Sequence, residues 1–207
     1  MSLDIKKVEV GPWKENSYCI KYGSNSVLID PGDEFELLLK EFAIDLSQAK
    51  AILLTHAHFD HIGAVSYFQS RFNLKTYLHS GDKKILHQAN LLRKMAGLKE
   101  VLITPTINHW LDSINEINLL DKPIYVHHLP GHSRGSVSFE IEKQLFSGDI
   151  YFNNSIGRSD LPGGDIKQLT ISLKLLCDRF EGYYIHPGHG ESYYLNSKVI
   201  DEILKKI

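Results

Sequence analysis

Three histidines and an aspartate fall within residues 56–61, directly after an apolar segment with the character of a β-strand. Imidazole nitrogens and carboxylate oxygens are the atoms that zinc and similar ions bind. An extended segment points residues two apart to the same side, so His56 and His58 can face one ion. We expect Asp60 to be the N-cap of a helix, where Asp60 and His61 can face a second ion.

Three later turns each carry one more side chain of this kind: His132 in a Pro-Gly-His turn, Asp149 in Ser-Gly-Asp and His189 in a second Pro-Gly-His. Each turn follows a segment with strand-like patterning. The predicted ligand sets are His56, His58 and His132 for one ion, and Asp60, His61 and His189 for the other, with Asp149 as the bridge. Two ions roughly 3.5–4 Å apart can hold a hydroxide between them and stabilise the oxyanion of an attacked carbonyl.

Apolar patterning predicts strands and helices in alternation along the chain. The predicted strands are 7–10, 17–22, 26–29, 51–54, 75–78, 124–128, 136–141 and 144–146, and the first three form a meander. The predicted helices are 34–42, 60–72, 80–96, 166–180 and 196–207. Asp165, with Gln168 three residues later, is typical of a helix start. Whether residues 80–118 form a lid over the site is left open.

Length and composition favour one compact domain over residues 1–207, because 43% of the residues are hydrophobic. The net charge of −2 gives no reason to expect a nucleic-acid partner. No apolar run approaches the roughly 18 residues that span a bilayer, so no membrane association is expected. Cys19 and Cys177 lie outside the ligand motifs and fit small buried residues in the reducing cytoplasm.

These motifs resemble those of the metallo-β-lactamase-fold hydrolases, in which an HxHxDH run is followed by a His, an Asp and a His. Here they correspond to residues 56–61, His132, Asp149 and His189. The loop 157–165, with the sequence GRSDLPGGD, is similar to that of short, single-domain glyoxalase II-like (hydroxyacylglutathione hydrolase-like) proteins. The resemblance implies an α/β fold, an αββα four-layer sandwich with the metals at one edge between two sheets.

The resemblance also implies a metal-dependent hydrolase that cleaves a glutathione-type thioester, such as S-lactoylglutathione, with a hydroxide held between two divalent ions. Zinc is the expected metal, and iron and manganese accept the same donors. By resemblance, Asp60 both binds metal and orients the hydroxide, which makes it the candidate catalytic residue. Arg158 is interpreted either as a turn residue that pairs with Asp160 or as the side chain that binds a substrate carboxylate. The expected partner is this small-molecule thioester, and the oligomeric state is left open.

Three alternatives stay beside this hypothesis. A single iron held by His56, His132 and Asp149 would make the chain a persulfide dioxygenase of the same superfamily, although the double glycine after Arg158 favours the hydrolase branch. A nucleic-acid phosphodiesterase would use the same metal pair, but the near-neutral charge disfavours it. A non-catalytic binding module on an enzyme fold is disfavoured by the complete ligand set.

Overall fold

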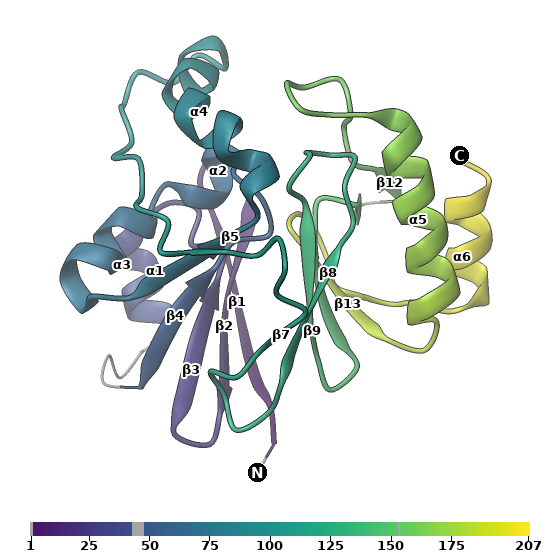
Figure 1. Ribbon diagram of the computed structural model, residues 1–207, viewed down its shortest axis with the longest axis horizontal. Helices are drawn as coiled ribbons and strands as arrows, with labels where there is room; N and C mark the ends of the chain where they lie inside the picture. Colours follow the sequence, from purple (N-terminus) through teal and green to yellow (C-terminus); the bar gives the residue numbers. More distant parts are fainter. Residues whose placement is uncertain (1, 43–47, 153) are drawn as a thin grey trace.

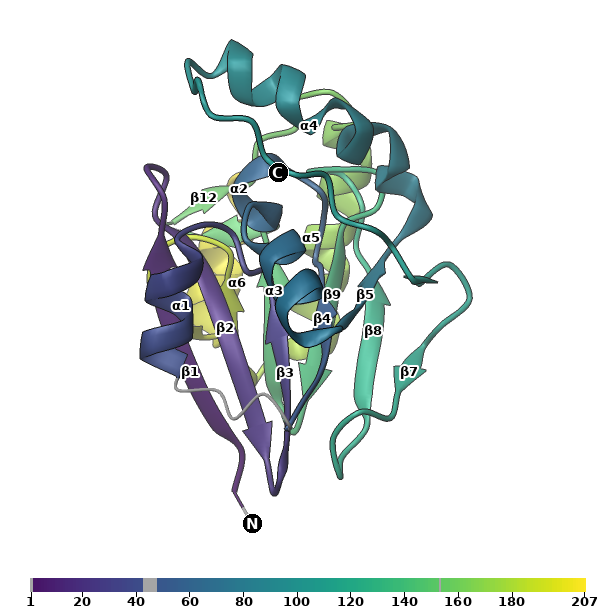
Figure 2. The same cartoon turned by 90° about the vertical axis from the view of Figure 1, so that its left-hand side faces the viewer.

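The computed structural model describes residues 2–42, 48–152 and 154–207. Two six-stranded sheets pack face to face, and helices cover the outer face of each sheet (Figure 1). A view turned by 90° shows helices α1 (Phe35–Phe42) and α3 (Val65–Phe72) in front of the first sheet (Figure 2). The predicted αββα four-layer α/β sandwich is therefore confirmed.

The first sheet begins with an antiparallel meander and continues with parallel strands. Its strands, in spatial order, are β1 (Asp4–Val10), β2 (Glu15–Tyr22), β3 (Asn25–Ile29), β4 (Ala49–Leu53), β5 (Lys75–Leu78) and β6 (His109–Trp110). Its outer face carries α1 (Phe35–Phe42) and α3 (Val65–Phe72). Because β3, β4 and β5 are parallel, the polar residues that follow them meet at one edge of the sheet.

The second sheet is built from the C-terminal half of the chain. Its strands, in spatial order, are β14 (Tyr193–Tyr194), β13 (Tyr184–Pro187), β10 (Gln144–Gly148), β9 (Val137–Ile141), β8 (Ile124–His128) and β7 (Glu116–Ile117). Its outer face carries α5 (Ile166–Phe180) and α6 (Ser197–Leu204). A short hairpin, β11 (Tyr151–Phe152) with β12 (Ser155–Ile156), follows β10. Strands β10 and β13 are parallel, so Asp149 and His189 leave the sheet at the same edge.

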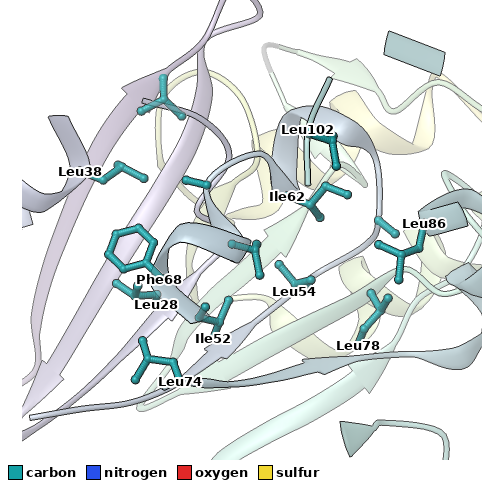
Figure 3. Packing of buried hydrophobic residues seen from close by; sticks show 14 of the residues in the cluster. Leu28, Leu38, Ile52, Leu54, Ile62, Phe68, Leu74, Leu78, Leu86 and Leu102 are labelled. Atoms are coloured by element: carbon teal, nitrogen blue, oxygen red, sulfur yellow. The ribbon is translucent and has the colours of Figure 1, made fainter. Parts of the chain in front are cut away.

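Three apolar layers fill the spaces between the four structural layers. Adjacent residues of β3 point to opposite faces, as strand geometry requires: Leu28 packs under the helices, whereas Val27 packs between the sheets. Figure 3 shows the first of these layers, with Leu28 and Ile52 of the sheet against Phe68 of α3. The buried stripe of α5 forms the third layer, on the second sheet.

Two local predictions about residues 60–72 are wrong. The segment forms two helices, α2 (Phe59–Ile62) and α3, because the amide of Ala64 donates to Pro31 O instead of continuing the helix. Asp60 is not an N-cap: His58 holds that position, and no side chain caps the helix there. Asp60 therefore lies in the first turn of α2 with its carboxylate free to face the site.

Other local predictions are confirmed. Asp165 caps α5, since its carboxylate accepts hydrogen bonds from the amides of Lys167 and Gln168. Cys19 and Cys177 are both buried and not in a disulfide. Residues 80–96 form a short 3₁₀ turn, η1 (Ser80–Asp82), followed by α4 (Lys83–Met95). Among the described residues, no helix has the length and apolar character that crossing a bilayer requires.

Candidate metal centre

The first predicted ligand set converges at the edge between the two sheets. His56 and His58 follow β4, and His132 follows β8. One ring nitrogen of each lies within 4.8 Å of the others, and all three rings are buried. Nδ1 of His58 lies 2.8 Å from Nε2 of His132. Segments 74 residues apart in the chain therefore bring three imidazoles to one point.

The second predicted set lies beside the first. Asp60 and His61 stand on α2, and His189 follows β13 in the other sheet. Their donor atoms also fall within 4.8 Å of one another, and Oδ2 of Asp60 lies 3.5 Å from Nε2 of His189. The rings of His56 and His61 are 4.0 Å apart between centroids, so the two sets are neighbours.

Asp149 stands between the two sets. Its Oδ2 lies 3.5 Å from Nε2 of His132 in the first set and 3.5 Å from Nε2 of His189 in the second. Its Oδ1 lies 3.6 Å from Nε2 of His61. This approach depends on Gly188, where a Cβ would stand 2.2 Å from Oδ1 of Asp149. The carboxylate is thus the group that can serve both sets.

Several polar atoms of the site are buried without a hydrogen-bond partner among the described residues. They are Nε2 of His56, His58 and His61, and Oδ1 of Asp149. Buried polar atoms in folded proteins are nearly always paired, and an ion is one of the few explanations for a cluster of exceptions. The donor set, imidazole nitrogens with carboxylate oxygens, is the one that zinc and related ions take. The residues therefore fit two divalent ions.

The other ring nitrogen of four histidines is held by a neighbouring group. The pairs are His56 with Thr55 Oγ1 (3.0 Å), His61 with Asp30 Oδ2 (3.0 Å), His132 with Arg158 O (2.7 Å) and His189 with Trp13 O (3.1 Å), each through Nδ1. Such contacts fix the tautomer and the orientation of a metal-binding ring. They leave Nε2 as the nitrogen available to an ion.

Burial and neighbouring charges shift the pKa values of the donor side chains in different directions. Burial lowers the pKa of His56 well below its ordinary value and that of His58 to about 3, so both rings are neutral with a free lone pair. Burial opposes the charge on Asp149, yet His61 and His189 hold its pKa well below the ordinary range. Burial likewise opposes a charge on His189, yet Asp149 raises its pKa to about 10.

Asp82, which the sequence analysis did not single out, ties the two histidine loops together. Its carboxylate is buried and accepts hydrogen bonds from the amide of Ala57 (2.9 Å), the hydroxyl of Ser133 (2.8 Å) and the amide of Gly135 (2.7 Å). Ala57 stands between two predicted ligands, and Ser133 follows a third. Asp82 is therefore a positioning residue for the first ligand set.

Asp30 and Glu15 are buried carboxylates that lie next to His61 of the second set. Asp30 accepts from both the amide and the hydroxyl of Thr55, and its Oδ2 contacts His61. Glu15 is fully buried, and its Oε1 lies 3.7 Å from Nδ1 of His61. Burial raises the pKa of Glu15 well above its ordinary value. Asp30 directly follows a predicted strand, 26–29, as His56 follows the strand before it, and that shared placement is the signal by which the sequence could have pointed to it.

A cavity of about 530 Å³ opens directly over the donor atoms. His58, Asp60, His132, Asp149 and His189 form its floor. Its walls are apolar and come from Trp13, Phe59, Leu92, Met95, Ala96, Phe152, Leu161 and Pro162. The end of α4 thus borders the mouth of the cavity.

Arg158 lies on the wall of this cavity, with 66% of its side chain exposed. It is bound to Asp160 through two hydrogen bonds of 2.9 and 2.8 Å, which is the turn-residue interpretation made from the sequence. The guanidinium still has donors beyond these two. The position of Arg158 is therefore compatible with binding a substrate in the cavity.

The chain thus has an α/β sandwich with paired His/Asp sets at the edge between its sheets. These features define a class of proteins with a candidate two-metal catalytic centre. The model of the metallo-beta-lactamase superfamily matches residues 10–191. The chain belongs to the metallo-beta-lactamase superfamily, and it is a metallo-hydrolase of that superfamily, as the resemblance implied.

Relatives of similar length support this assignment. The chain is 33% identical to the probable metallo-hydrolase YqgX of Bacillus subtilis over 89% of both chains. It is 34% identical to the hydroxyacylglutathione hydrolase GloC of Haemophilus influenzae over 91% of both. A crystal structure of TTHA1623 in a di-iron-bound form superposes with a TM-score of 0.81 at 41% identity, covering 92% of this chain and 94% of the other.

Proposed function

We propose that this chain hydrolyses a glutathione-type thioester, with S-lactoylglutathione as the first substrate to test, and that it does so with two divalent ions, zinc being the expected metal. The observation that carries the proposal is Asp149, whose carboxylate contacts histidines of both donor sets at the floor of one cavity. GloC, named as a hydroxyacylglutathione hydrolase, supports the thioester. The di-iron form of TTHA1623 supports a two-metal site and makes iron the first competitor of zinc.

In this proposal His56, His58 and His132 hold one ion, Asp60, His61 and His189 hold the other, and Asp149 contacts both. Such an ion pair supplies a water of lowered pKa and an electrophile for the carbonyl oxygen.

The side chains of the site position the reactants. Asp60 lines the cavity and accepts a hydrogen bond from the attacking water, which turns the lone pair of that water toward the carbonyl carbon. Water adds to the thioester carbonyl, the C–S bond breaks, and the products are a carboxylic acid and a thiol. Since a thiol has a pKa of about 8.5, it leaves as a thiolate without a general acid on the chain.

We place this reaction in the cytoplasm with a small molecule as the partner. The two buried cysteines support that setting, because Cys19 and Cys177 are both free thiols.

The test is thiol release from S-lactoylglutathione by zinc-loaded protein, followed with a thiol reagent. We expect turnover by the wild-type chain and a loss of about 100-fold or more in Asp149→Asn, which lacks the shared carboxylate. The control is Asp201→Asn, which removes an exposed carboxylate on α6, outside the cavity and its donor sets. Zinc-loaded protein without turnover would reject the proposal, and oxygen consumption with glutathione persulfide would then test the persulfide dioxygenase alternative.

Arg158 provides a second prediction. If its free guanidinium donors bind a carboxylate of the substrate, Arg158→Ala raises KM about tenfold and changes kcat less than about twofold, because the lost contact is the same in the bound substrate and the transition state. Steady-state kinetics measure both constants. Arg158→Lys is the matched control, since it keeps the charge but not the two-pronged geometry. An unchanged KM in Arg158→Ala would limit the residue to its pair with Asp160.

A further inference from the structure

The walls of the cavity are apolar in a way that core packing does not explain. Met95 at the end of α4 is 75% exposed, and Trp13 in the turn between β1 and β2 is 40% exposed, yet both face the cavity. Phe152 of β11 and Leu161 of the loop before α5 also line the cavity, and with Trp13 and Met95 they form an apolar ring around it. Three parts of the chain, around residues 13, 95 and 152–161, thus bring apolar side chains to one opening.

The aromatic side chains of this ring are held in place by their neighbours. Trp13 packs edge-to-face on Phe59 with ring centroids 5.1 Å apart, and the guanidinium of Arg93 lies 5.9 Å from the ring of Phe59 on α2. Phe152 packs against the ring of His189 with centroids 5.3 Å apart. The apolar surface therefore begins directly at the donor atoms, where the substituent next to a reacting carbonyl would lie.

The ring offers little to a charged group. Among the described side chains that line the cavity, Arg158 is the one with a permanent positive charge, and two of its donors are taken by Asp160. The carboxylates of a glutathione carrier would therefore extend toward the solvent side of Arg158. The substituent that fits inside the ring is neutral and apolar.

We infer that the apolar ring of Trp13, Met95, Phe152 and Leu161 binds an aliphatic acyl group, so that medium-chain acyl thioesters are better substrates than the short, hydroxylated lactoyl thioester. This inference rests on the proposed thioester hydrolysis and names its acyl class. Each methylene that leaves water for the ring is expected to strengthen binding about two- to fourfold.

Binding of S-alkylglutathiones tests the inference without turnover, because these thioethers are not hydrolysed. Titration calorimetry compares S-methyl- and S-hexylglutathione on the metal-loaded protein. We expect the hexyl compound to bind roughly 30-fold or more tightly. Met95→Glu should reduce that ratio about fivefold, because it places a charge on the ring. A ratio between two ligands cancels any repulsion between the new carboxylate and the shared glutathione part.

Val101→Glu is the matched control, since Val101 is 77% exposed and lies outside the cavity. Its hexyl-to-methyl ratio should equal that of the wild-type chain. Equal affinities for the two ligands in the wild-type chain would overturn the inference. An equal fall of the hexyl-to-methyl affinity ratio in Met95→Glu and Val101→Glu would overturn it as well. A failure of both ligands to bind would also overturn it.

A turnover measurement separates this inference from the proposed function. Hexanoylglutathione is expected to be hydrolysed with a kcat/KM about tenfold above that of S-lactoylglutathione. Chain-length-dependent binding with no thioester turnover would support the apolar ring and reject the proposed function. Turnover of both thioesters at equal rates, with equal binding of the alkyl ligands, would keep the proposed function and reject the acyl class.

Discussion

The Asp149→Asn variant is expected to bind both metal ions more than about 100-fold more weakly than the wild-type chain, a larger loss than the removal of an outer contact causes. Its carboxylate contacts His132 in one donor set and both His61 and His189 in the other. Asparagine has nearly the same shape, but it carries no charge and one of its two polar atoms is a donor. Both donor sets therefore lose the anionic oxygen that they share.

Metal content after dialysis against a chelator of known affinity measures this effect. The wild-type chain should retain two ions per chain at chelator concentrations that strip the variant. Asp201→Asn is again the control, because its side chain is exposed on α6 and lies outside the cavity and both donor sets. Two ions retained by Asp149→Asn with wild-type affinity would mean that the ions do not share this carboxylate.

The fold was predicted from the family resemblance, whereas local patterns predicted most of the strands and the donor residues, because those signals are local. His56 and His58 follow a buried strand, and the later turns carry one donor each after a strand. A residue that directly follows a strand lies where the strands of the sheet end, whatever the position of that strand in the sheet. The seven predicted metal-site residues accordingly come together, although the order of strands in each sheet was not predicted.

The errors and omissions concern contacts between distant segments. Asp60 has the residue type of an N-cap, but α2 begins at Phe59 with His58 as its N-cap, which leaves the Asp60 carboxylate for the site. The bond from the amide of Ala64 to Pro31 O, on a distant segment, is what separates α2 from α3. Asp82 is invisible as a functional residue because its partners lie 25 to 53 residues away. The cavity wall was missed for the same reason, since Trp13 and Met95 meet only in the folded chain.

Asp82→Ala is expected to weaken both the fold and the first ligand set. It leaves the amides of Ala57 and Gly135 and the hydroxyl of Ser133 without their acceptor. Unpaired buried donors cost about 1–3 kcal/mol each, so the free energy of unfolding of the metal-free chain should fall by about 3 kcal/mol or more. Metal affinity should fall about 10- to 100-fold, as is typical when a contact that orients ligands is lost.

Urea unfolding of the metal-free chain and metal titration of the folded chain separate the two effects. Asp82→Asn supplies a milder variant if the alanine variant does not fold.

The control is Asp112→Ala. Asp112 accepts hydrogen bonds from the amide and hydroxyl of Ser80 in the same 3₁₀ turn but touches neither histidine loop. It should change stability by less than about 1 kcal/mol and leave metal affinity unchanged, since the carboxylate is exposed. In the intact site, ring nitrogens of His58 and His132 lie 2.8 Å apart. If the two histidine loops separate when Asp82 is removed, His58 moves relative to His132. Metal affinity within about threefold of wild type in a destabilised Asp82 variant would show instead that the two loops hold their positions without the carboxylate, and that Asp82 serves the fold alone.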